Sequence, residues 1–255
     1  MKTQILAIAN QKGGVGKTTT ALSLASALHR LEKKILVIDL DPHACATIHL
    51  AYFPEKVASS SLDLFSPDWK GDQWNGMILK QTPHGFDFIA GSVRLSDVEG
   101  ELKGKPGKGL LLRERIGAVD TDYDYILIDC PPQVGVLLVN ALAASDLVII
   151  PIQTDFLALH GLKLIFDTLR MLNKAMPSKI QYRALATMYD RRAGACRRVL
   201  NLLRKKMGTR LFETVINTDT NFREASAVGK VILDHAPQSR GSYEYLRLAK
   251  EIAGR

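Results

Sequence analysis

Cysteine and tryptophan are scarce in this sequence, which has three cysteines and two tryptophans among 255 residues. The cysteines, Cys45, Cys130 and Cys196, are far apart in the chain, and none belongs to a CxxC pair. The six histidines show no spacing typical of metal ligands. These absences argue against a disulfide framework and against a zinc site, so we expect a protein of a reducing compartment.

Long hydrophobic runs are missing as well. The most apolar stretches, YILID at 125–129 and DLVIIPI at 146–152, are far too short to span a bilayer and are typical of buried strands. The first two residues lead directly into an apolar run, so we expect no signal peptide. The sequence therefore predicts a cytoplasmic protein without a membrane-spanning helix.

Positive charge exceeds negative charge, which gives a formal net charge of +8 and a pI near 9.4. This excess suits an acidic partner such as nucleic acid or an anionic membrane, but it is also a common way of keeping a protein soluble. Both interpretations stay open at this point. A hydrophobic content of 46% and a mean hydropathy near zero are typical of a globular protein.

Strand-like and helix-like patterns alternate along most of the chain. The predicted strands cover 3–9, 34–39, 86–90, 124–129, 146–152, 182–188 and 211–216. The predicted helices cover 16–31, 109–119, 135–144, 159–175, 193–207, 222–228 and 241–253. Such alternation favours parallel pairing, and the nearly continuous apolar character of the central strands indicates helices on both faces. We therefore predict an α/β fold with a doubly wound, mostly parallel sheet flanked by helices.

Two stretches lack a clear period, namely 53–83, rich in Ser, Pro, Asp, Gly and Trp, and 100–108, GELKGKPGK. We predict that both are surface loops or insertions rather than domain boundaries. A chain of this length is ordinary for a single α/β domain, so residues 1–255 are predicted to form one domain.

The segment ILAIANQKGGVGKTT at 5–19 joins the first predicted strand to the first predicted helix through a glycine-rich turn. Glycines at 13, 14 and 16 have no Cβ, so the backbone can wrap a polyphosphate and direct several N–H groups at it. The helix N-terminus and Lys17 add positive charge, and Thr18 offers a hydroxyl where Mg²⁺ is usually bound. The segment predicts a phosphate-binding loop.

Acidic residues follow two of the predicted central strands. Asp39 and Asp41 come at the end of ILVID, and Asp129 ends YILID. Ligands of a doubly wound sheet collect outside the carboxyl ends of its strands, so these carboxylates share an edge with the phosphate loop. Carboxylates beside a bound triphosphate repel it unless a cation lies between them, and Mg²⁺ would supply that cation.

One departure from the usual phosphate loop points to a family. The general pattern GxxxxGK[ST] has its first glycine at the position of Gln11, and a second lysine, Lys12, follows here. KGGVGKT is the deviant Walker A form, and with it the chain resembles the ParA/MinD family of partition and positioning ATPases, in particular its ParA-type (Soj-like) members. Matching stretches extend over nearly the whole chain: DYDYILIDCPPQ, ASDLVIIPIQTDFLALHGL, ATMYDRR and GKVILDHAPQSRGSYEYLRLAKEI.

This resemblance implies a slow, Mg²⁺-dependent ATP hydrolase. Asp129 corresponds to the Walker B aspartate, Asp39 to an outer-shell residue of the metal, and Asp41 to the switch I residue that positions the attacking water. Together with Thr18, Asp39 and Asp129 form the expected metal site, and Lys12, Lys17 and Asp41 are the expected catalytic residues. The expected ATP contacts are Lys12, Gly13, Gly14, Val15, Gly16, Lys17, Thr18, Thr19, Met188 and Asp190, with Asn217–Asp219 as a second candidate at the adenine.

In the family, the signature lysine reaches into the partner subunit's site across a dimer that encloses the nucleotide. The resemblance therefore implies that Lys12 acts in trans, that ATP binding drives homodimerisation, and that hydrolysis releases the monomers. A partner protein with a basic N-terminal segment is expected to stimulate hydrolysis. We expect no membrane anchor, because the apolar stripe Tyr243, Leu246, Ala249 and Ile252 is sized to dock the last helix onto the core.

Departures from the family pattern concern switch I and the DNA-contact stretches. The usual DPQGN reads here Asp41-Pro42-His43-Ala44-Cys45. Thr218 and Asp234 stand where basic residues are common, whereas Arg240 is retained. A relocated basic patch could bind DNA without sequence specificity, although a solvated helix face is an equal alternative. The candidate DNA contacts are Arg191, Arg192, Arg197, Arg198, Lys205, Lys206 and Arg240, with Arg204 and Arg210 in the same cluster.

Three functional hypotheses follow. The first is an ATPase that positions or segregates a plasmid, a chromosome or a protein array, located at the nucleoid or a cell pole. The second is a nucleotide-gated scaffold with negligible hydrolysis. The third is a reductase of the nitrogenase-iron-protein type, which would need two well-placed cysteines per subunit.

Overall fold

A computed structural model describes residues 2–159 and 162–254, and these residues build a seven-stranded sheet. The strands lie in the order β3-β2-β4-β1-β5-β6-β7, and neighbouring strands are parallel. Leu79 adds an antiparallel bridge to Phe88. The strands are β1 (Gln4–Ile8), β2 (Ile35–Asp39), β3 (Asp87–Ile89), β4 (Tyr125–Asp129), β5 (Leu147–Gln153), β6 (Gln181–Tyr189) and β7 (Leu211–Asn217).

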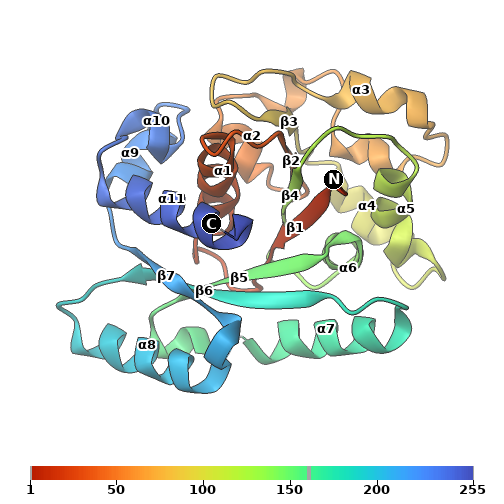
Figure 1. Ribbon diagram of the computed structural model, residues 1–255. Helices are drawn as coiled ribbons and strands as arrows, with labels where there is room; N and C mark the ends of the chain where they lie inside the picture. Colours follow the sequence, from red (N-terminus) through yellow and green to blue (C-terminus); the bar gives the residue numbers. More distant parts are fainter. Residues whose placement is uncertain (1, 160–161, 255) are drawn as a thin grey trace.

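Helices cover both faces of this sheet, which confirms the predicted doubly wound α/β class. Figure 1 shows α1 and α11 side by side on one face and α7 and α8 on the other. The helices are α1 (Lys17–His29), α2 (Cys45–His49), α3 (Trp74–Met77), α4 (Leu95–Leu102), α5 (Leu111–Gly117), α6 (Val136–Ala144), α7 (Leu162–Ala175), α8 (Gly194–Met207), α9 (Asn221–Ala227), α10 (Ile232–His235) and α11 (Arg240–Ala253).

The two faces of the sheet carry two separate hydrophobic cores. Successive side chains of a strand point to opposite faces, so Leu6 and Ile8 enter the core under α1 and α11, while Ala7 and Ala9 enter the core under α6 and α7. Because both faces are covered, all five residues of β4 are buried. This double burial explains the continuous apolar runs in the sequence.

The register of the central strands brings the acidic residues together. In the β2–β4 pair, Asp39 lies opposite Asp129, and in the β1–β4 pair, Ile8 lies opposite Asp129. The last residues of these three strands therefore end at the same level. The chain leaves β1 at this level and forms the glycine-rich loop that leads into α1. The predicted phosphate loop and both acidic strand ends thus share one edge of the sheet.

Of the two predicted alternatives for the segment 53–83, a surface loop or an insertion, the structure contradicts a surface loop, because part of the segment packs into the core. It contains 3₁₀ turns at Pro54–Lys56, Ser61–Phe65 and Gly71–Gln73 besides α3. Trp69, Trp74 and Met77 are only 8%, 3% and 2% exposed and belong to the core under α6. Short 3₁₀ turns without a long period carry these apolar residues inward, so a search for helical or strand periodicity misses them.

Smaller corrections concern three other helices. Residues 100–102 of the predicted loop 100–108 belong to the end of α4, which was not predicted. The start of the predicted helix 159–175 includes residues 160–161, which lie outside the described residues. On α11, Tyr243 of the predicted stripe is 57% exposed, whereas Ala249 is buried and Leu246 and Ile252 pack against the core beside Tyr245 and Leu248. The predicted stripe therefore faces the core except at Tyr243.

Candidate functional site

The glycine-rich loop has a left-handed backbone at two of its glycines. Gly14 has φ +73° and Gly16, the residue before α1, has φ +91°, a region that other residues rarely adopt. A Cβ atom added at position 13, 14 or 16 would meet no atom within 4 Å. The loop therefore encloses free space on its inner side, as a cradle for a polyphosphate requires.

Neighbouring strands hold the loop in place. The Thr187 hydroxyl on β6 donates to the Val15 carbonyl (2.9 Å). Asn10, just ahead of the loop, accepts from the Lys12 backbone N–H (3.0 Å) and donates to the Pro151 carbonyl (2.7 Å). Sequence reasoning missed both supporting residues, although Asn10 lies directly between strand and loop, where a positioning side chain could have been sought. These bonds fix the loop to β5 and β6.

The two loop lysines have different surroundings. Lys17 is only 8% exposed, and its Nζ lies 3.4 Å from the Lys12 carbonyl oxygen, so it points back into the loop. Lys12 is partly exposed, and its Nζ lies 3.3 Å from Oε1 of Gln153 at the end of β5. In this structure, the Lys12 ammonium is therefore held by its own chain beside the loop.

Asp129 is fully buried beside the loop. Its Oδ2 accepts a 2.7 Å hydrogen bond from the Thr18 hydroxyl, whereas its Oδ1 is buried and has no partner among the described residues. Burial and the nearby negative charge of Asp39 raise the pKa of the Asp129 carboxyl well above its ordinary value. The charge of Lys17 offsets an ionised carboxylate here only in part, and a bound divalent ion would offset the rest.

Asp39 is buried too, but both of its oxygens are engaged. Oδ2 accepts from the Thr47 backbone N–H (2.9 Å) and hydroxyl (2.7 Å), and Oδ1 accepts from the Asp41 N–H (3.2 Å). Burial raises the pKa of Asp39 to about 6. Such a carboxylate suits an indirect role near a metal better than direct ligation. A close approach by Gly91 completes its shell, since a Cβ there would lie 2.8 Å from the Asp39 carboxyl.

These residues fit Mg²⁺ together with a nucleotide but not a metal held by protein ligands alone. Within the described part of the chain, no group of three or more His, Cys, Asp or Glu side chains could hold a metal ion. Mg²⁺ commonly takes one or two protein ligands and completes its shell with phosphate oxygens and water. Thr18 and Asp129 are the pair that would contact it or its waters.

A cavity of about 1030 Å³ extends from the loop towards the ends of β6 and β7. Gly16, Thr19 and Met188 line it, and so do Asn217 and Asp219. Met188 has φ +51°, which is rare for a residue with a side chain, at a point where the register between β6 and β7 shifts. Such strain is often found at binding sites. The cavity is large enough for the base and sugar of a nucleotide.

Asp190 and Arg240 have surroundings that the sequence did not indicate. The Asp190 carboxylate does not line the cavity and instead binds the guanidinium of Arg192 at 3.0 and 3.1 Å. Arg240 lines the cavity at the start of α11, and among the other candidate DNA contacts Arg192 lines it too. The remaining basic residues lie on α8 and its flanks, all exposed: Arg191, Arg192, Arg197, Arg198, Arg204, Lys205, Lys206 and Arg210.

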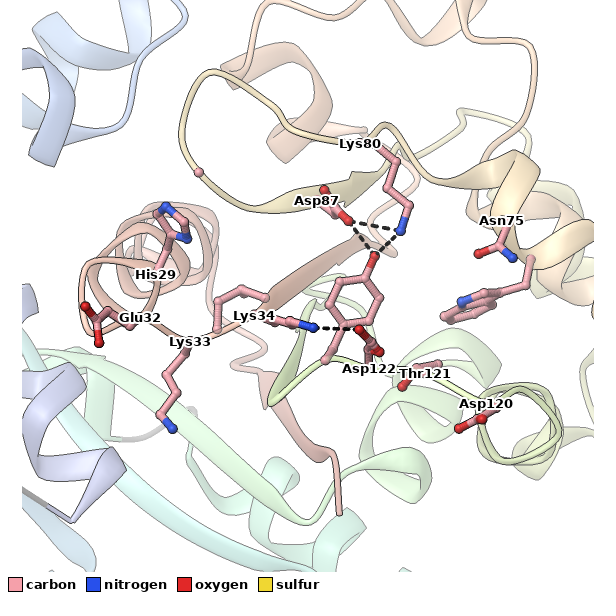
Figure 2. A pocket seen from close by; sticks show the side chains of 14 residues that line it. His29, Glu32, Lys33, Lys34, Asn75, Lys80, Asp87, Asp120, Thr121 and Asp122 are labelled. Carbon is pink, nitrogen blue, oxygen red and sulfur yellow. Dashed lines mark hydrogen bonds and ion pairs between the residues drawn. The ribbon is translucent and has the colours of Figure 1, made fainter. Parts of the chain in front are cut away.

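A second cavity, of about 470 Å³, opens at the amino-terminal edge of the strands (Figure 2). Several of its charged side chains pair with one another, for example Lys34 with Asp122 (2.6 Å) and Lys80 with Asp87 (3.2 Å). Tyr123 also donates to Asp87 (2.6 Å). Because these charges are already paired and lie at the edge opposite the glycine loop, we assign this cavity no part in the site.

The surroundings of the cysteines do not favour an iron–sulfur cluster. Burial and Asp41 raise the pKa of the Cys45 thiol to about 11, and burial raises that of Cys130 well above its ordinary value. Cluster ligation requires thiolates, which such surroundings disfavour. Across the parts of the chain that the structure describes, no helix combines the length and apolar character needed to cross a bilayer.

Comparisons with known proteins show which family the chain is similar to. The family model described as an AAA domain matches residues 3–182. The chain is 37% identical to the sporulation initiation inhibitor protein Soj of Bacillus subtilis, covering 98% of both chains. It is also 34% identical to the chromosome partitioning protein ParA of Caulobacter vibrioides, covering 99% of this chain and 94% of that protein.

Solved structures give the same picture. A putative plasmid partition protein from Borrelia burgdorferi bound to AMPPNP superposes with a TM-score of 0.84 at 25% identity, and 99% of both chains is covered. Cobyrinic acid a,c-diamide synthase from Mycobacterium smegmatis with bound ADP and magnesium has a TM-score of 0.81 at 29% identity, covering 100% of this chain and 97% of that one. The chain therefore belongs to the ParA/MinD family and is a Soj-like member of it.

Proposed function

We propose that residues 1–255 form a single Mg²⁺-dependent ATPase domain that positions or segregates a large cargo by cycling between an ATP-bound dimer and an ADP-bound monomer. The observation that carries this proposal is the buried Asp129 next to a loop with room for a polyphosphate. One of its oxygens accepts from Thr18, and the other has no partner among the described residues. Relatives named for chromosome partitioning, and structures bound to ADP with magnesium or to AMPPNP, support it.

Each residue of the loop has a distinct part in this proposal. The backbone N–H groups from Gly13 to Thr19 bind the phosphates, and Lys17 neutralises their charge from inside the loop. Thr18 and Asp129 hold the metal or its waters, with Asp39 behind them. Bound Mg²⁺ would polarise the phosphate oxygens and offset their charge. Asp41, only 5% exposed, positions the attacking water.

Base binding is assigned to the cavity beside the loop. Met188 and the segment Asn217–Asp219 line it and would contact the adenine or its ribose. Asp190 does not reach the cavity, so we propose that it acts there only through Arg192, which does line it.

Dimerisation is proposed from Lys12 and from the exposed apolar surface around the site. Val134, which follows β4, is 47% exposed, and Leu157, which follows β5, is 70% exposed. Apolar residues that flank a nucleotide site are suited to contact a second copy. The Lys12 ammonium would leave Gln153 and bind the phosphates held by the partner subunit. Its charge would stabilise the transferring phosphoryl group there.

Light scattering with ATP and Mg²⁺, together with the rate of phosphate release, tests this proposal. We expect the wild-type chain to dimerise with ATP and Lys12→Ala to remain a monomer that still binds ATP. Lys179→Ala, an exposed lysine ahead of β6 at the opposite edge of the sheet, is the matched control and should behave as wild type. A Lys12→Ala protein that dimerises and hydrolyses normally would exclude the role in trans.

We further propose that DNA is the surface on which the dimer moves, through the basic residues of α8. Val199, Leu200 and Leu203 bury one face of α8, so its cations are presented together on the other. A partner protein with a basic N-terminal segment is proposed to stimulate hydrolysis. Phosphate release with and without such a peptide separates this ATPase from a nucleotide-gated scaffold, which would stay inactive in both.

Localisation in living cells would identify the cargo. A fluorescent fusion of an ATPase that uses DNA as its matrix should decorate the nucleoid in an ATP-dependent manner, and one that serves a protein array should mark a pole. Asp41→Ala, which should block hydrolysis, is expected to freeze the distribution. A diffuse signal for both proteins would contradict the positioning role.

A further inference from the structure

The residues that follow Asp41 fold back onto its carboxylate. The Ala44 N–H donates to the Asp41 carbonyl (2.8 Å), which closes a four-residue turn, and Ala44 has φ +49°. Inside this turn, the His43 backbone N–H donates to Asp41 Oδ1 (2.9 Å). This is the arrangement of an Asx turn, in which an aspartate caps the backbone two residues ahead. The turn places the His43 side chain beside the Asp41 side chain.

The imidazole makes a second bond to the same oxygen. His43 Nδ1 lies 2.9 Å from Asp41 Oδ1. A carboxylate oxygen accepts, so Nδ1 carries the proton in this pair. Within the described residues no hydrogen bond reaches Asp41 Oδ2. Oδ1 is thus held at two points by one residue, while Oδ2 keeps its full capacity to accept.

The exposed fractions show where the pair faces. The Asp41 side chain is 7% exposed and the His43 side chain 66% exposed. The imidazole therefore covers Asp41 from the solvent side without being buried itself. Asp41 is also tied from the inside, since its backbone N–H donates to Asp39 Oδ1 (3.2 Å). The backbone of Asp41 is consequently tied to Asp39, and its carboxylate is tied to His43.

We propose that His43 is a positioning residue for ATP hydrolysis, which fixes the Asp41 carboxylate so that Oδ2 is the oxygen that holds the attacking water. This inference rests on the proposed function, because it assigns Asp41 the water. A freely rotating carboxylate would offer the water several orientations, and misplacement of a reacting group by even a fraction of its bond length slows an in-line attack. His43 removes that freedom through its Nδ1 donor.

Two substitutions separate the donor from the ring. His43→Asn keeps an amide nitrogen at the position of Nδ1, and His43→Phe keeps the ring but has no donor. We expect His43→Phe to lower kcat about tenfold, as the loss of a hydrogen bond to a charged group predicts, with KM for ATP unchanged. His43→Asn should restore most of the wild-type kcat. Because the side chain is largely exposed, neither change should prevent folding.

Asp41→Ala supplies the lower limit of the rate, and the affinity for a fluorescent ATP analogue is measured for all four proteins. The inference is overturned if His43→Phe has the wild-type kcat, if His43→Asn is as slow as His43→Phe, or if either variant binds the analogue more weakly. If the wild-type chain hydrolyses ATP and His43→Phe hydrolyses it equally fast, this inference alone is refuted. If the wild-type chain and Asp41→Ala both fail to hydrolyse ATP, the proposed function and this inference fall together.

Discussion

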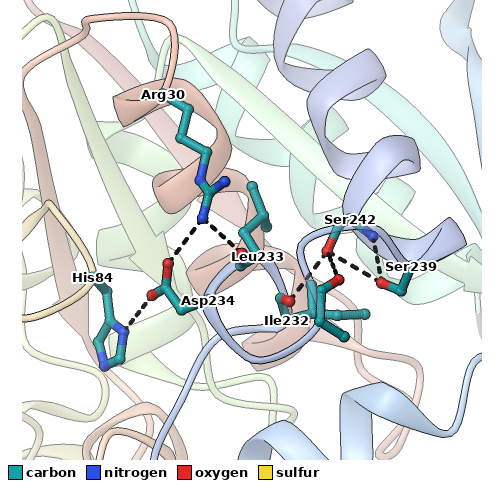
Figure 3. Close-up of polar contacts among 8 residues, drawn as sticks. Arg30, His84, Ile232, Leu233, Asp234, Ser239 and Ser242 are labelled. Atoms are coloured by element: carbon teal, nitrogen blue, oxygen red, sulfur yellow. Dashed lines mark hydrogen bonds and ion pairs between the residues drawn. The ribbon is translucent and has the colours of Figure 1, made fainter.

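Asp234 links three separated parts of the chain. Its Oδ1 accepts from the Arg30 guanidinium (3.0 Å) at the end of α1, and its Oδ2 lies 2.8 Å from Nδ1 of His84, ahead of β3 (Figure 3). The same guanidinium donates to the Leu233 carbonyl (2.6 Å). The family resemblance described above implies a basic residue at this position. In this chain, the acidic replacement joins α1, α10 and the 82–86 turn, and the position is therefore unsuited to binding DNA.

We predict that Asp234→Ala lowers the free energy of unfolding by about 2 kcal/mol, because it leaves the nearly buried His84 and the half-exposed Arg30 without their carboxylate. Asp234→Asn should have a smaller effect, since its amide oxygen still accepts one of the two bonds. Urea denaturation measures both. The exposed Asp68→Ala serves as control, and equal midpoints for Asp234→Ala and Asp68→Ala would contradict the structural role.

A site residue could be predicted where the residues that define its role lie close to it in the sequence. Gly16, Lys17 and Thr18 belong to one continuous motif, so their spacing alone assigns them to a phosphate loop. Asp190 differs, because its local pairing with Arg192 follows from side-chain geometry that no spacing rule describes. Thr187 was missed because the bond from its hydroxyl to the Val15 carbonyl joins residues 172 positions apart.

At the scale of elements, α4 holds the start of α6. The carboxylate of Glu99 accepts from the backbone N–H groups of Val136 (2.8 Å) and Leu137 (3.0 Å), which otherwise have no partner at the first turn of a helix. Gly135 gives the carboxylate room, since a Cβ there would lie within 2.1 Å of it. The segment between Asp129 and α6 is thereby fixed at its far end by another helix.

We predict that Glu99→Ala lowers the free energy of unfolding by about 1–2 kcal/mol, as the loss of a charged helix cap does. Hydrogen exchange should rise most in the first turn of α6 and in residues 130–135. Glu101→Ala, a change at an exposed residue of the same helix, is the control. Unchanged exchange at Val136 and Leu137 would show that Glu99 does not cap the helix.

The basic face of α8 makes a second prediction at this scale. Arg198→Glu combined with Lys205→Glu should weaken binding to a random DNA duplex at least tenfold in low salt. The affinity should also depend less on salt, because a protein with fewer cations releases fewer counterions from the DNA when it binds. Lys103→Glu combined with Lys105→Glu changes the net charge equally on the α4–α5 connection and should leave binding nearly intact. A gel shift over a salt series decides it, and equal losses in both double variants would exclude α8 as the contact.

Element boundaries followed from the sequence where one pattern dominates. The strands at 35–39 and 125–129 are buried on both faces, so their apolar runs are continuous and their ends are marked by aspartate. The prediction of a surface loop over 53–83 was wrong because Trp69 and Trp74 reach the core from short turns, each too brief to show a period. On α11, hydrophobicity located Leu246, Ala249 and Ile252 at the core, but the buried Gly241, Ser242 and Glu244 are not apolar, so the start of the inward face could not be recognised in this way.

At the scale of the whole molecule, the parallel sheet concentrates negative charge at one edge. Asp39 and Asp129 end neighbouring strands in register, and both are fully buried. Folding therefore brings two carboxylates together in a place where water cannot solvate them. The metal-free fold is destabilised by their ionisation, and ATP with Mg²⁺ should reverse this by binding only the folded chain. The stability of the whole fold thus reports on the site.

The pH dependence of unfolding tests this connection. Burial raises the pKa of Asp39 from an ordinary 3.8 to about 6, so the folded chain binds the proton more tightly than the unfolded chain. The stability that protonated Asp39 contributes is complete below the unfolded pKa and is lost as pH rises towards the folded pKa.

We predict that the free energy of unfolding of metal-free Asp39→Asn, relative to that of wild type, rises by roughly 2 kcal/mol as the pH is raised from about 4.5 to about 7.5. The estimate follows because each unit of pKa shift is worth about 1.4 kcal/mol. Taking the difference between the two proteins at each pH removes any constant effect of the substitution and the titration of groups that do not interact with Asp39. The titration of Asp129 does not cancel, because the charge of Asp39 raises its pKa. With saturating ATP and Mg²⁺, which offset the charge of Asp39, the same difference should shrink. A difference that stays constant with pH would mean that Asp39 titrates normally, and that the crowding of carboxylates at this edge does not destabilise the metal-free fold.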